Sequence, residues 1–319
     1  MTKPRIVVVG SSNTDMVIRL ARLPGPGETI LGGEFVTVAG GKGANQAVGA
    51  ARAGGGVTFI ARVGSDSLGA QALAGFRREG INTRHIVRDA ASPSGVALIF
   101  VGAEGQNSIA VAGGANQRLS VRDVRAAAPA IRAARCLLLQ LETPLETVQA
   151  AATLAAKAGV RVILNPAPAC PLPDELLRQV SILTPNETEA ALLSGIPVGD
   201  EQSAARAAEK LLARGVRTVV ITMGARGAFV ADGGVRQLMP GFPVDAVDTV
   251  AAGDVFNGAL AVALAEGRDL AEAVRFANAA AAISVTRAGA QPSAPSRAEI
   301  QSLLRTGRVP RPAKRRAGG

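Results

Sequence analysis

Residues 5–10 read RIVVVG, and after a glycine-rich turn residues 43–53 read GANQAVGAARA. The first stretch is a short, continuously apolar run, which is typical of a strand that is covered on both faces of a parallel sheet. The second stretch is rich in alanine and predicts a helix. This unit of a strand and a helix indicates an alternating α/β chain.

The same alternation continues along the chain. Further apolar runs, each expected to be a strand, lie at 57–63, 136–140, 160–164, 180–183 and 218–222. Helical segments are expected at 67–78, 120–133, 145–158, 200–214 and 254–265. We therefore expect an α/β fold of three layers, α/β/α, in which helices cover both faces of a mostly parallel sheet.

Two stretches, residues 16–38 and 94–112, interrupt this alternation and show no helical period. The first contains Pro24, Pro26 and a pair of glycines, and the second has two strand-like runs on either side of Glu104. We expect inserted antiparallel strands that form a small β-sheet, a lid over a pocket or a contact with a second copy of the chain. Ordinary long surface hairpins are the alternative.

The chain has 319 residues, and we assign residues 1–306 to one domain. The formal net charge is +10, and six basic residues lie in the last fifteen residues, where there is no acid. With Pro310 and Pro312, this composition predicts a disordered basic tail at residues 307–319. An arm that binds nucleic acid or a partner is the alternative, although the chain has no Trp or Tyr to stack on bases.

Composition argues against several other classes of protein. Cys136 and Cys170 lie in apolar surroundings without CxxC spacing, which argues against a disulfide scaffold or a zinc site and favours the cytoplasm. No suitable apolar run reaches the roughly 20 residues of a membrane span, and no hydrophobic leader precedes the first strand. His85 is the only histidine, and we expect it to be structural.

The glycine turn GGKGANQA at residues 40–47 is the first candidate site. It is not a Walker A loop, because that loop needs Gly in place of Val36 and Ser or Thr in place of Gly43. Gly41 lets the backbone approach a ligand, and Lys42 and Asn45 point the same way at a helix start. They could bind hydroxyl groups; a turn that only begins an alanine-rich helix is the alternative.

Residues 248–260, DTVAAGDVFNGAL, are the second candidate site. Ala251, Ala252 and Gly253 would offer unobstructed backbone N–H groups at a helix N-terminus, where the helix dipole concentrates positive potential. Asp254 would lie beside them and could accept the proton of an attacking alcohol while they stabilise a phosphoryl group. An Asp that only caps the helix is the alternative.

Other polar residues follow expected strands, at the edge where open α/β sheets bind ligands. Asn13 and Asp15 are two residues apart in extended chain, so both face one direction. Glu142 and the loop 222–227 each follow a later strand. The first strand is followed by a single glycine, Gly10, which argues against the GxGxxG loop of a dinucleotide-binding dehydrogenase.

Asn186 and Glu189 lie one helical turn apart in the segment TPNETE at residues 184–189. They could hold a hydrated Mg²⁺ ion, which keeps several waters and needs only one or two protein carboxylates. The same spacing is typical of a helix capping box, and on spacing alone this interpretation is the stronger one.

The segments GGKGANQAVGAARAGG (40–55) and DTVAAGDVFNGAL (248–260) resemble the two signature segments of the ribokinase-like (PfkB) carbohydrate kinases. The likeness extends from about residue 5 to residue 305 and includes NPAPA (165–169), TPNETEA (184–190) and VTRAGAQPS (285–293). It implies an enzyme that transfers the γ-phosphoryl group of Mg·ATP to O5 of D-ribose. A homodimer is expected to form through the lid strands, because exposed strand edges seek partners. Sister kinases for deoxyribose, fructose or a nucleoside share this scaffold and are the alternative.

The resemblance also implies roles for single residues. The sugar-binding residues would be Asn13, Asp15, Gly41, Lys42, Asn45, Glu142 and Asp254. Asp254 would be the general base, beside an anion hole of Ala251, Ala252 and Gly253. The ATP pocket would comprise Asn186, Thr222, Gly224, Gly227, Gly253 and Asn278, with Glu189 acting on Mg²⁺ through water. An activating K⁺ ion would lie at Asp248, Val250, Ser284, Arg287, Gly289 and Ser293, several of them binding through backbone carbonyls.

Overall fold

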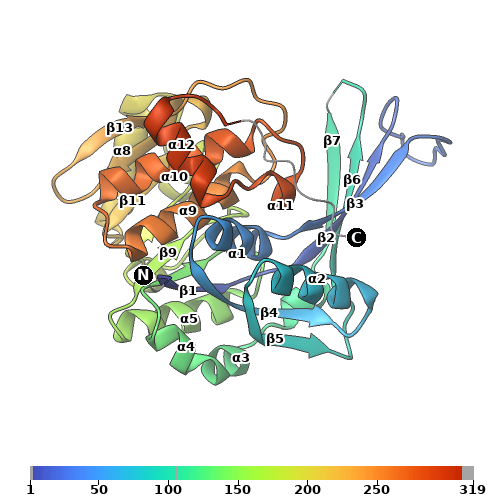
Figure 1. Cartoon of the computed structure of the whole chain (residues 1–319), viewed down its shortest axis with the longest axis horizontal. Coiled ribbons are helices and arrows are strands. Elements are labelled where there is room, and N and C mark those ends of the chain that lie inside the picture. Colours follow the sequence, from blue (N-terminus) through green and yellow to red (C-terminus); the bar gives the residue numbers. More distant parts are fainter. Residues whose placement is uncertain (1–2, 105, 311–319) are drawn as a thin grey trace.

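In the computed structural model, which describes residues 3–104 and 106–310, nine strands form one sheet through the middle of the molecule (Figure 1). Seven neighbouring strands pair in parallel, and two more continue the sheet as an antiparallel edge. In spatial order from that edge, they are β13 (Arg236–Pro240), β12 (Gly227–Ala231), β11 (Thr218–Thr222), β10 (Ile182–Leu183), β9 (Arg161–Leu164), β8 (Cys136–Leu139), β1 (Arg5–Val9), β4 (Gly56–Gly64) and β5 (Asn82–Asp89). The predicted, mostly parallel sheet is confirmed.

Helices cover both faces of this sheet. Along β1, Ile6 and Val8 face one helical layer and Val7 and Val9 face the other, because successive side chains of a strand alternate. The first layer contains α1 (Lys42–Arg52), α2 (Ser67–Arg78), α9 (Ala252–Ala265), α10 (Leu270–Ser284) and α12 (Arg297–Thr306). The second contains α3 (Val121–Ala126), α4 (Ala128–Arg132), α5 (Leu145–Lys157), α6 (Asp174–Leu177), α7 (Glu187–Ser194) and α8 (Glu201–Ala213). The three-layer architecture is confirmed.

The structure differs from the expected elements at a few places. The single helix expected over residues 120–133 is wrong: α3 ends before Ala127, and Pro129, which has no N–H group to donate, lies at the start of α4. The edge strand β5 reads NTRHIVRD and has only two apolar residues, Ile86 and Val87, so a search for continuous apolar runs does not find it. The mostly exposed strand β13 is not predicted either, because it also lacks a long apolar run.

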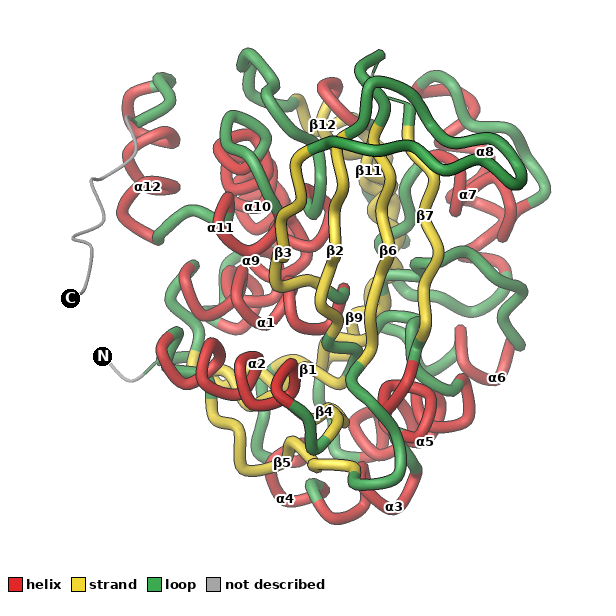
Figure 2. Tube along the Cα trace, turned by 90° about the vertical axis from the view of Figure 1, so that its right-hand side faces the viewer, coloured by secondary structure: helices red, strands yellow, loops and turns green. Residues whose placement is uncertain are grey.

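Four further strands of the described chain form a separate small sheet in the order β3-β2-β6-β7, called the lid sheet below. They are β2 (Asn13–Arg19), β3 (Glu34–Gly40), β6 (Gly95–Val101) and β7 (Asn107–Ala112). Figure 2 shows them side by side, facing the viewer. The expected small sheet is present, but its central pair, β2 and β6, is parallel rather than antiparallel. Since β2 begins at Asn13, both Asn13 and Asp15 lie on the lid sheet itself.

At the C-terminal end, the structure describes the chain to Pro310. Val309 packs against the core beside α12, so described, packed structure extends three residues into the predicted tail 307–319. The rest of that tail, residues 311–319, lies outside the described residues. Within residues 3–104 and 106–310, no helix has both the length and the apolar character required to cross a membrane.

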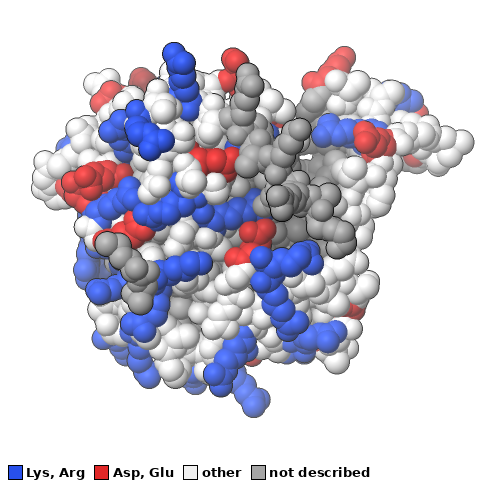
Figure 3. Space-filling model, viewed as in Figure 1, with Lys and Arg blue, Asp and Glu red and all other residues white. Residues whose placement is uncertain are grey.

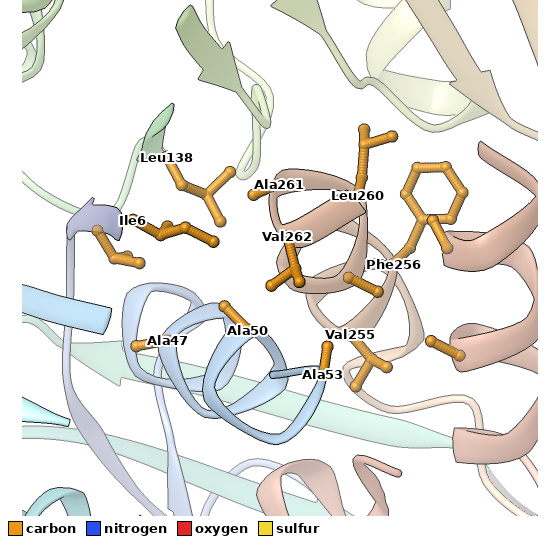
Figure 4. Close-up of a cluster of buried hydrophobic side chains, with 14 of the residues drawn as sticks. Ile6, Ala47, Ala50, Ala53, Leu138, Val255, Phe256, Leu260, Ala261 and Val262 are labelled. Atoms are coloured by element: carbon orange, nitrogen blue, oxygen red, sulfur yellow. The ribbon is translucent and has the colours of Figure 1, made fainter. Parts of the chain in front are cut away.

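The helices of the two signature segments, α1 and α9, pack against each other in the core, next to Ile6 of β1 and Leu138 of β8 (Figure 4). Their backbones approach closely at two glycines. A Cβ atom on Gly258 would lie 2.6 Å from the backbone nitrogen of Ala50, and one on Gly49 would lie 3.3 Å from the Cα atom of Val255. Residues that are some 200 positions apart in the sequence are thereby brought into contact along the two helices.

Candidate active site

Asp254, in the first turn of α9, is the point at which the two segments meet. Its side chain is buried, and the residue is 6% exposed. The Nδ2 atom of Asn45 donates a hydrogen bond to Oδ2 of Asp254, and the Nε2 atom of Gln46 donates one to Oδ1, each at 3.0 Å. Two consecutive residues of α1 therefore hold both oxygens of one carboxylate of α9.

Gln46 belongs to a chain of buried amides below Asp254. Its Nε2 atom also donates to Oδ1 of Asn165 at 3.0 Å, and its Oε1 atom accepts a hydrogen bond from Nε2 of Gln140. The side-chain N–H groups and the side-chain oxygen of Gln46 therefore all have hydrogen-bond partners. Because a buried amide with all its partners has few alternative rotamers, Gln46 fixes the orientation of the Asp254 carboxylate.

The chain of polar groups continues under the start of α9. The Nδ2 atom of Asn165 donates to the carbonyl of Thr184 at 3.1 Å, and the Thr184 hydroxyl donates to Oδ1 of Asn257 at 2.6 Å. Asn257 in turn donates to the carbonyl of Gly253 at 2.8 Å. These residues and Gln46 were not predicted from the sequence, although each is a polar side chain next to or within an apolar run.

Burial raises the pKa of Asp254 above its ordinary value, and the negative charge of Glu142 adds to this effect. The positive charge of Lys42 and the hydrogen bonds from Asn45 and Gln46 oppose it. A carboxylate with a raised pKa accepts a proton more readily, which suits a general base.

Asp15 lies in the same electrostatic environment. Burial, followed by the charges of Glu142 and Asp254, raises the pKa of Asp15 to about 6, and Lys42 acts against this shift. Side chains from β2, α1, the loop after β8 and α9 therefore influence one another across one cluster.

Backbone geometry leaves room for the two polar residues of β2. Asn13 accepts a hydrogen bond on Oδ1 from Asn116 Nδ2 at 2.7 Å, a contact that the sequence analysis did not find. A Cβ atom on Gly95 would lie 2.2 Å from Oδ1 of Asn13, and one on Gly40 would lie 2.2 Å from Oδ2 of Asp15. A larger residue at either position would force these polar side chains out of their observed places.

Glu142 joins the glycine turn to the end of β8. Its Oε2 atom accepts hydrogen bonds from the backbone N–H of Lys42, at 2.9 Å, and from the Ser11 hydroxyl. Gly41 has a φ of 88°, and a Cβ atom there would lie 2.6 Å from the backbone nitrogen of Asn13. The structure thus brings the predicted sugar-binding residues of β2, the turn, α1 and the β8 loop to one place.

The predicted anion hole lies at the N-terminus of α9. Ala251 has a φ of 60°, the only positive φ of a non-glycine residue in the described chain, and such strain is often found at functional sites. A Cβ atom on Gly253 would meet nothing within 4 Å, so its backbone faces open space. One detail differs from the expectation: the N–H of Ala252 is not unobstructed, because it donates to the Thr249 carbonyl at 3.3 Å.

The predicted nucleotide-binding residues follow β10 and β11. Asn186 and Glu189 form a capping box at the start of α7, with distances of 2.8 and 2.9 Å. Asn186 also pairs with Thr222 in a parallel bridge. Burial raises the pKa of Glu189, and the charges of Lys42 and Asp254 act on it too, so Glu189 lies near the cluster as well.

Two of the predicted nucleotide-binding residues have structural roles. Gly227 has a φ of 103°, and a Cβ atom there would lie 2.2 Å from the Met239 carbonyl, so pairing of β12 with β13 requires glycine. Asn278 on α10 donates to the carbonyls of Met239 and Pro240 at 3.2 Å each and thereby ties α10 to β13. Gly224, by contrast, faces open space with a φ of 56°.

The predicted K⁺-binding residues lie on two adjoining segments. The Asp248 carboxylate accepts hydrogen bonds from the backbone N–H of Val250 at 2.9 Å and of Gly289 at 2.8 Å. The side chain of Arg287 turns away to Glu299, at 2.6 Å. The hydroxyls of Ser284 and Ser293 donate to carbonyls in their own helices, α10 and α11 (Ala290–Ser293), at 2.8 and 2.7 Å.

The remaining candidates lie outside this cluster. His85 is on the edge strand β5, and burial lowers its pKa. Cys136 is buried on β8, and neither it nor Cys170 is in a disulfide. Among residues 3–104 and 106–310, no three His, Cys, Asp or Glu side chains are grouped so that they could hold a metal ion.

Comparisons with known proteins show which family the chain resembles. A model described as pfkB family carbohydrate kinase matches residues 3–297. The chain is 50% identical to the ribokinase of Haemophilus influenzae over 94% of this chain and 98% of that protein. It is 37% identical to the deoxyribokinase of Salmonella typhimurium over 94% and 98%. It resembles the structure of Arabidopsis thaliana ribokinase complexed with ribose and ATP, with a TM-score of 0.88, 37% identity and coverage of 95% and 99%.

Proposed function

The chain belongs to the pfkB family of carbohydrate kinases and phosphorylates ribose with ATP, and we propose that the cluster around Asp254 carries out this reaction. The observation that carries the proposal is the buried Asp254 carboxylate, which lies at the N-terminus of α9 and is held by Asn45 and Gln46 of α1. A base and a group of backbone N–H donors are thereby placed side by side.

In this proposal the sugar lies among Asn13, Asp15, Lys42 and Glu142, with its O5 hydroxyl facing Asp254. O5 forms a bond to the γ-phosphorus as the bond from that phosphorus to the β–γ bridging oxygen breaks, and ADP leaves with the electron pair. The proton of O5 passes to the Asp254 carboxylate. Positioning and charge stabilisation, rather than a covalent enzyme intermediate, supply most of the catalysis.

The N-terminus of α9 stabilises the transferring phosphoryl group. The N–H groups of Ala251 and Gly253 have no acceptor in the described part of the chain and are available to phosphoryl oxygens, whereas that of Ala252 is shared with Thr249. The positive end of the helix dipole adds to this stabilisation. The cost of the left-handed backbone at Ala251, of order 1–2 kcal/mol, is explained if it aims these groups at the phosphate.

The proposal also includes sites for two cations, Mg²⁺ and K⁺. Mg²⁺, when bound, neutralises phosphate charge; it needs few protein carboxylates, which fits the buried Glu189 acting through water. For K⁺, carbonyls of the segments around Asp248 and Gly289 are the proposed ligands, because the Asp248 carboxylate already accepts two backbone N–H groups. The Asp248 segment leads directly into Ala251, so an ion there would order the anion hole.

We place a homodimer contact on the outer face of the lid sheet. The strand register puts Asn13 and Asp15 on one face of this sheet, and Met16, Ile18, Phe35, Leu98 and Phe100 on the other. Phe35 is 60% exposed and Leu98 46% exposed, and a patch of exposed apolar side chains is typical of an interaction site. A second copy that covers this face would hold the inner face over the sugar. The free cysteines fit a cytoplasmic protein.

A kinase for deoxyribose is the second candidate, because the deoxyribokinase of Salmonella typhimurium matches nearly the whole chain. The test is a coupled ADP-release assay across ribose, deoxyribose, fructose and adenosine, with and without K⁺. We expect the highest kcat/KM with ribose and a higher rate with K⁺ than without it. A higher kcat/KM for deoxyribose would overturn the choice of sugar, and an equal rate without K⁺ would overturn the cation site.

A further inference from the structure

A basic hollow lies at the amino edge of the nine-stranded sheet, at the other end of α9 from Asp254. It has a volume of about 1060 Å³. The arginines that line it are Arg5, Arg132, Arg135, Arg161, Arg217 and Arg268. Three carboxylates also line it, so these six arginines leave a net charge of +3 in the described lining. Figure 3 shows Lys and Arg side chains on the left of the view, near the place where β1 begins in Figure 1.

The register of the sheet arranges four of these arginines in a row. Arg5 begins β1, Arg135 directly precedes β8, Arg161 begins β9 and Arg217 directly precedes β11. The backbone N–H of Arg135 donates to the Arg5 carbonyl at 2.8 Å, which makes these two residues neighbours. With strands about 4.8 Å apart, the row from β1 to β11 extends over roughly 19 Å.

Most of the lining arginines have no partner in the described part of the chain. Within residues 3–104 and 106–310, the guanidinium groups of Arg5, Arg132, Arg135 and Arg217 make no hydrogen bond or ion pair. Arg161 differs, because it donates to the Leu264 carbonyl at the end of α9, at 3.0 Å. Unpaired charges of one sign in a concave site raise the local potential and attract anions.

Each carboxylate of the hollow already has partners other than Arg5, Arg132, Arg135 and Arg217. Glu266 forms an ion pair with Arg268 at 3.1 Å and another with Arg297. Asp232 accepts the backbone N–H groups of its own turn, and Asp269 caps α10. None of them offsets the charge of the four free guanidinium groups.

We propose that this hollow binds a small ligand that carries two or more linked phosphate groups, at a site separate from the ATP site at the carboxyl edge. A guanidinium group binds phosphate through two parallel hydrogen bonds, and neighbouring strands present such groups side by side. The volume of about 1060 Å³ is at the upper limit for small-molecule sites, whose usual range is roughly 300–1,000 Å³. No aromatic side chain is among the described lining residues, which argues against a single-stranded nucleic acid that stacks its bases.

The test is calorimetric titration of inorganic pyrophosphate into the full chain. Ribose and a non-hydrolysable ATP analogue are present at saturation, so that the site around Asp254 is filled. We expect one saturable site, which the double variant Arg5→Gln, Arg135→Gln weakens roughly 100-fold through the loss of two charge-assisted contacts. The matched control, Arg122→Gln with Arg125→Gln, removes the same charge from exposed positions of α3 and should bind as the wild type does.

The outcomes separate the alternatives. Absence of saturable pyrophosphate binding, or an equal loss in both double variants, would overturn the proposal. Displacement of pyrophosphate by ADP would support a nucleotide as the source of the phosphates, and binding of pyrophosphate that ADP does not displace would support an inorganic source. Binding of a single-stranded oligonucleotide without binding of pyrophosphate would overturn the proposal of a small ligand. Unchanged melting temperatures of the variants show that their fold is intact.

Discussion

Asp254 and Asp15 both place a carboxylate in the same cluster, but different parts of the molecule hold them. Asp254 is held by Asn45 and by Gln46, all of whose amide groups have partners in the interior. Asp15 lies on the lid sheet, whose outer face is apolar and partly exposed, and its carboxylate has no hydrogen-bond partner within residues 3–104 and 106–310. From this difference we expect the interior to set the geometry of the proposed proton transfer and the lid sheet to set the affinity for the sugar.

The largest effect is expected at Asp254. Asp254→Asn keeps the shape of the side chain but cannot accept the proton, so kcat should fall by on the order of 10²- to 10⁴-fold, the range for a general base. Steady-state kinetics with ribose and ATP measure this, and the melting temperature checks the fold. Near-normal turnover by this variant would show that Asp254 is not the base.

Gln46→Ala tests whether the buried amides orient Asp254, and it leaves Asp254 itself unchanged. Loss of the amide frees the Asp254 carboxylate to rotate, and a misplacement of about 1 Å can lower kcat up to about 100-fold. We expect a fall in kcat of roughly 10- to 100-fold with little change in the KM for ribose. Gln149→Ala on α5, outside the cluster, is the matched control. A rise in KM with an unchanged kcat would place Gln46 in sugar binding instead.

The contact between Gln46 and Asp254 was also not predicted from the sequence. The apolar runs predicted β1 and β8, and the spacing around Asp254 predicted a helix start beside a candidate base. That Gln46 and Asp254 meet depends on the packing of α1 against α9, which no local pattern encodes. Their meeting could be expected only from the resemblance to a kinase family.

The lid sheet was predicted by the absence of a helical period, but its pairing was not. Nothing local in residues 16–38 or 94–112 shows that β2 pairs in parallel with β6, because that pairing joins segments some 80 residues apart. Asn116, which holds Asn13, was missed because its polar side chain lies in a short turn without a motif.

The pH dependence of the KM for ribose tests the proposed role of Asp15 on the lid sheet. Because the pKa of Asp15 is raised to about 6, this carboxylate takes up a proton as the pH falls through 6 and then accepts hydrogen bonds from sugar hydroxyls less strongly. We expect the KM for ribose to rise about tenfold between pH 7 and pH 5, in proportion to the loss of the ionised form. Asp15→Asn should have a higher KM that no longer changes in this range. The same pH-dependent step in KM in the variant would assign it to another group.

The smallest effect is expected on the outer face of the lid sheet. Phe35→Ser with Leu98→Ser removes two exposed apolar side chains without changing any group that faces the sugar. We expect dissociation to monomers in analytical ultracentrifugation and a rise of several-fold in the KM for ribose, with kcat little changed. Val235→Ser, at an exposed apolar residue outside the lid sheet, is the control. A wild-type chain that sediments as a monomer would refute the dimer.

A double-mutant cycle between Gln46 and Asp254 tests most directly whether the two signature segments act as one unit on the sugar. kcat is measured for the wild type, Gln46→Ala, Asp254→Asn and the double variant. If Gln46 acts by orienting the base, Gln46→Ala lowers kcat in the wild type and leaves it almost unchanged in the Asp254→Asn background. Equal losses in both backgrounds would contradict the account.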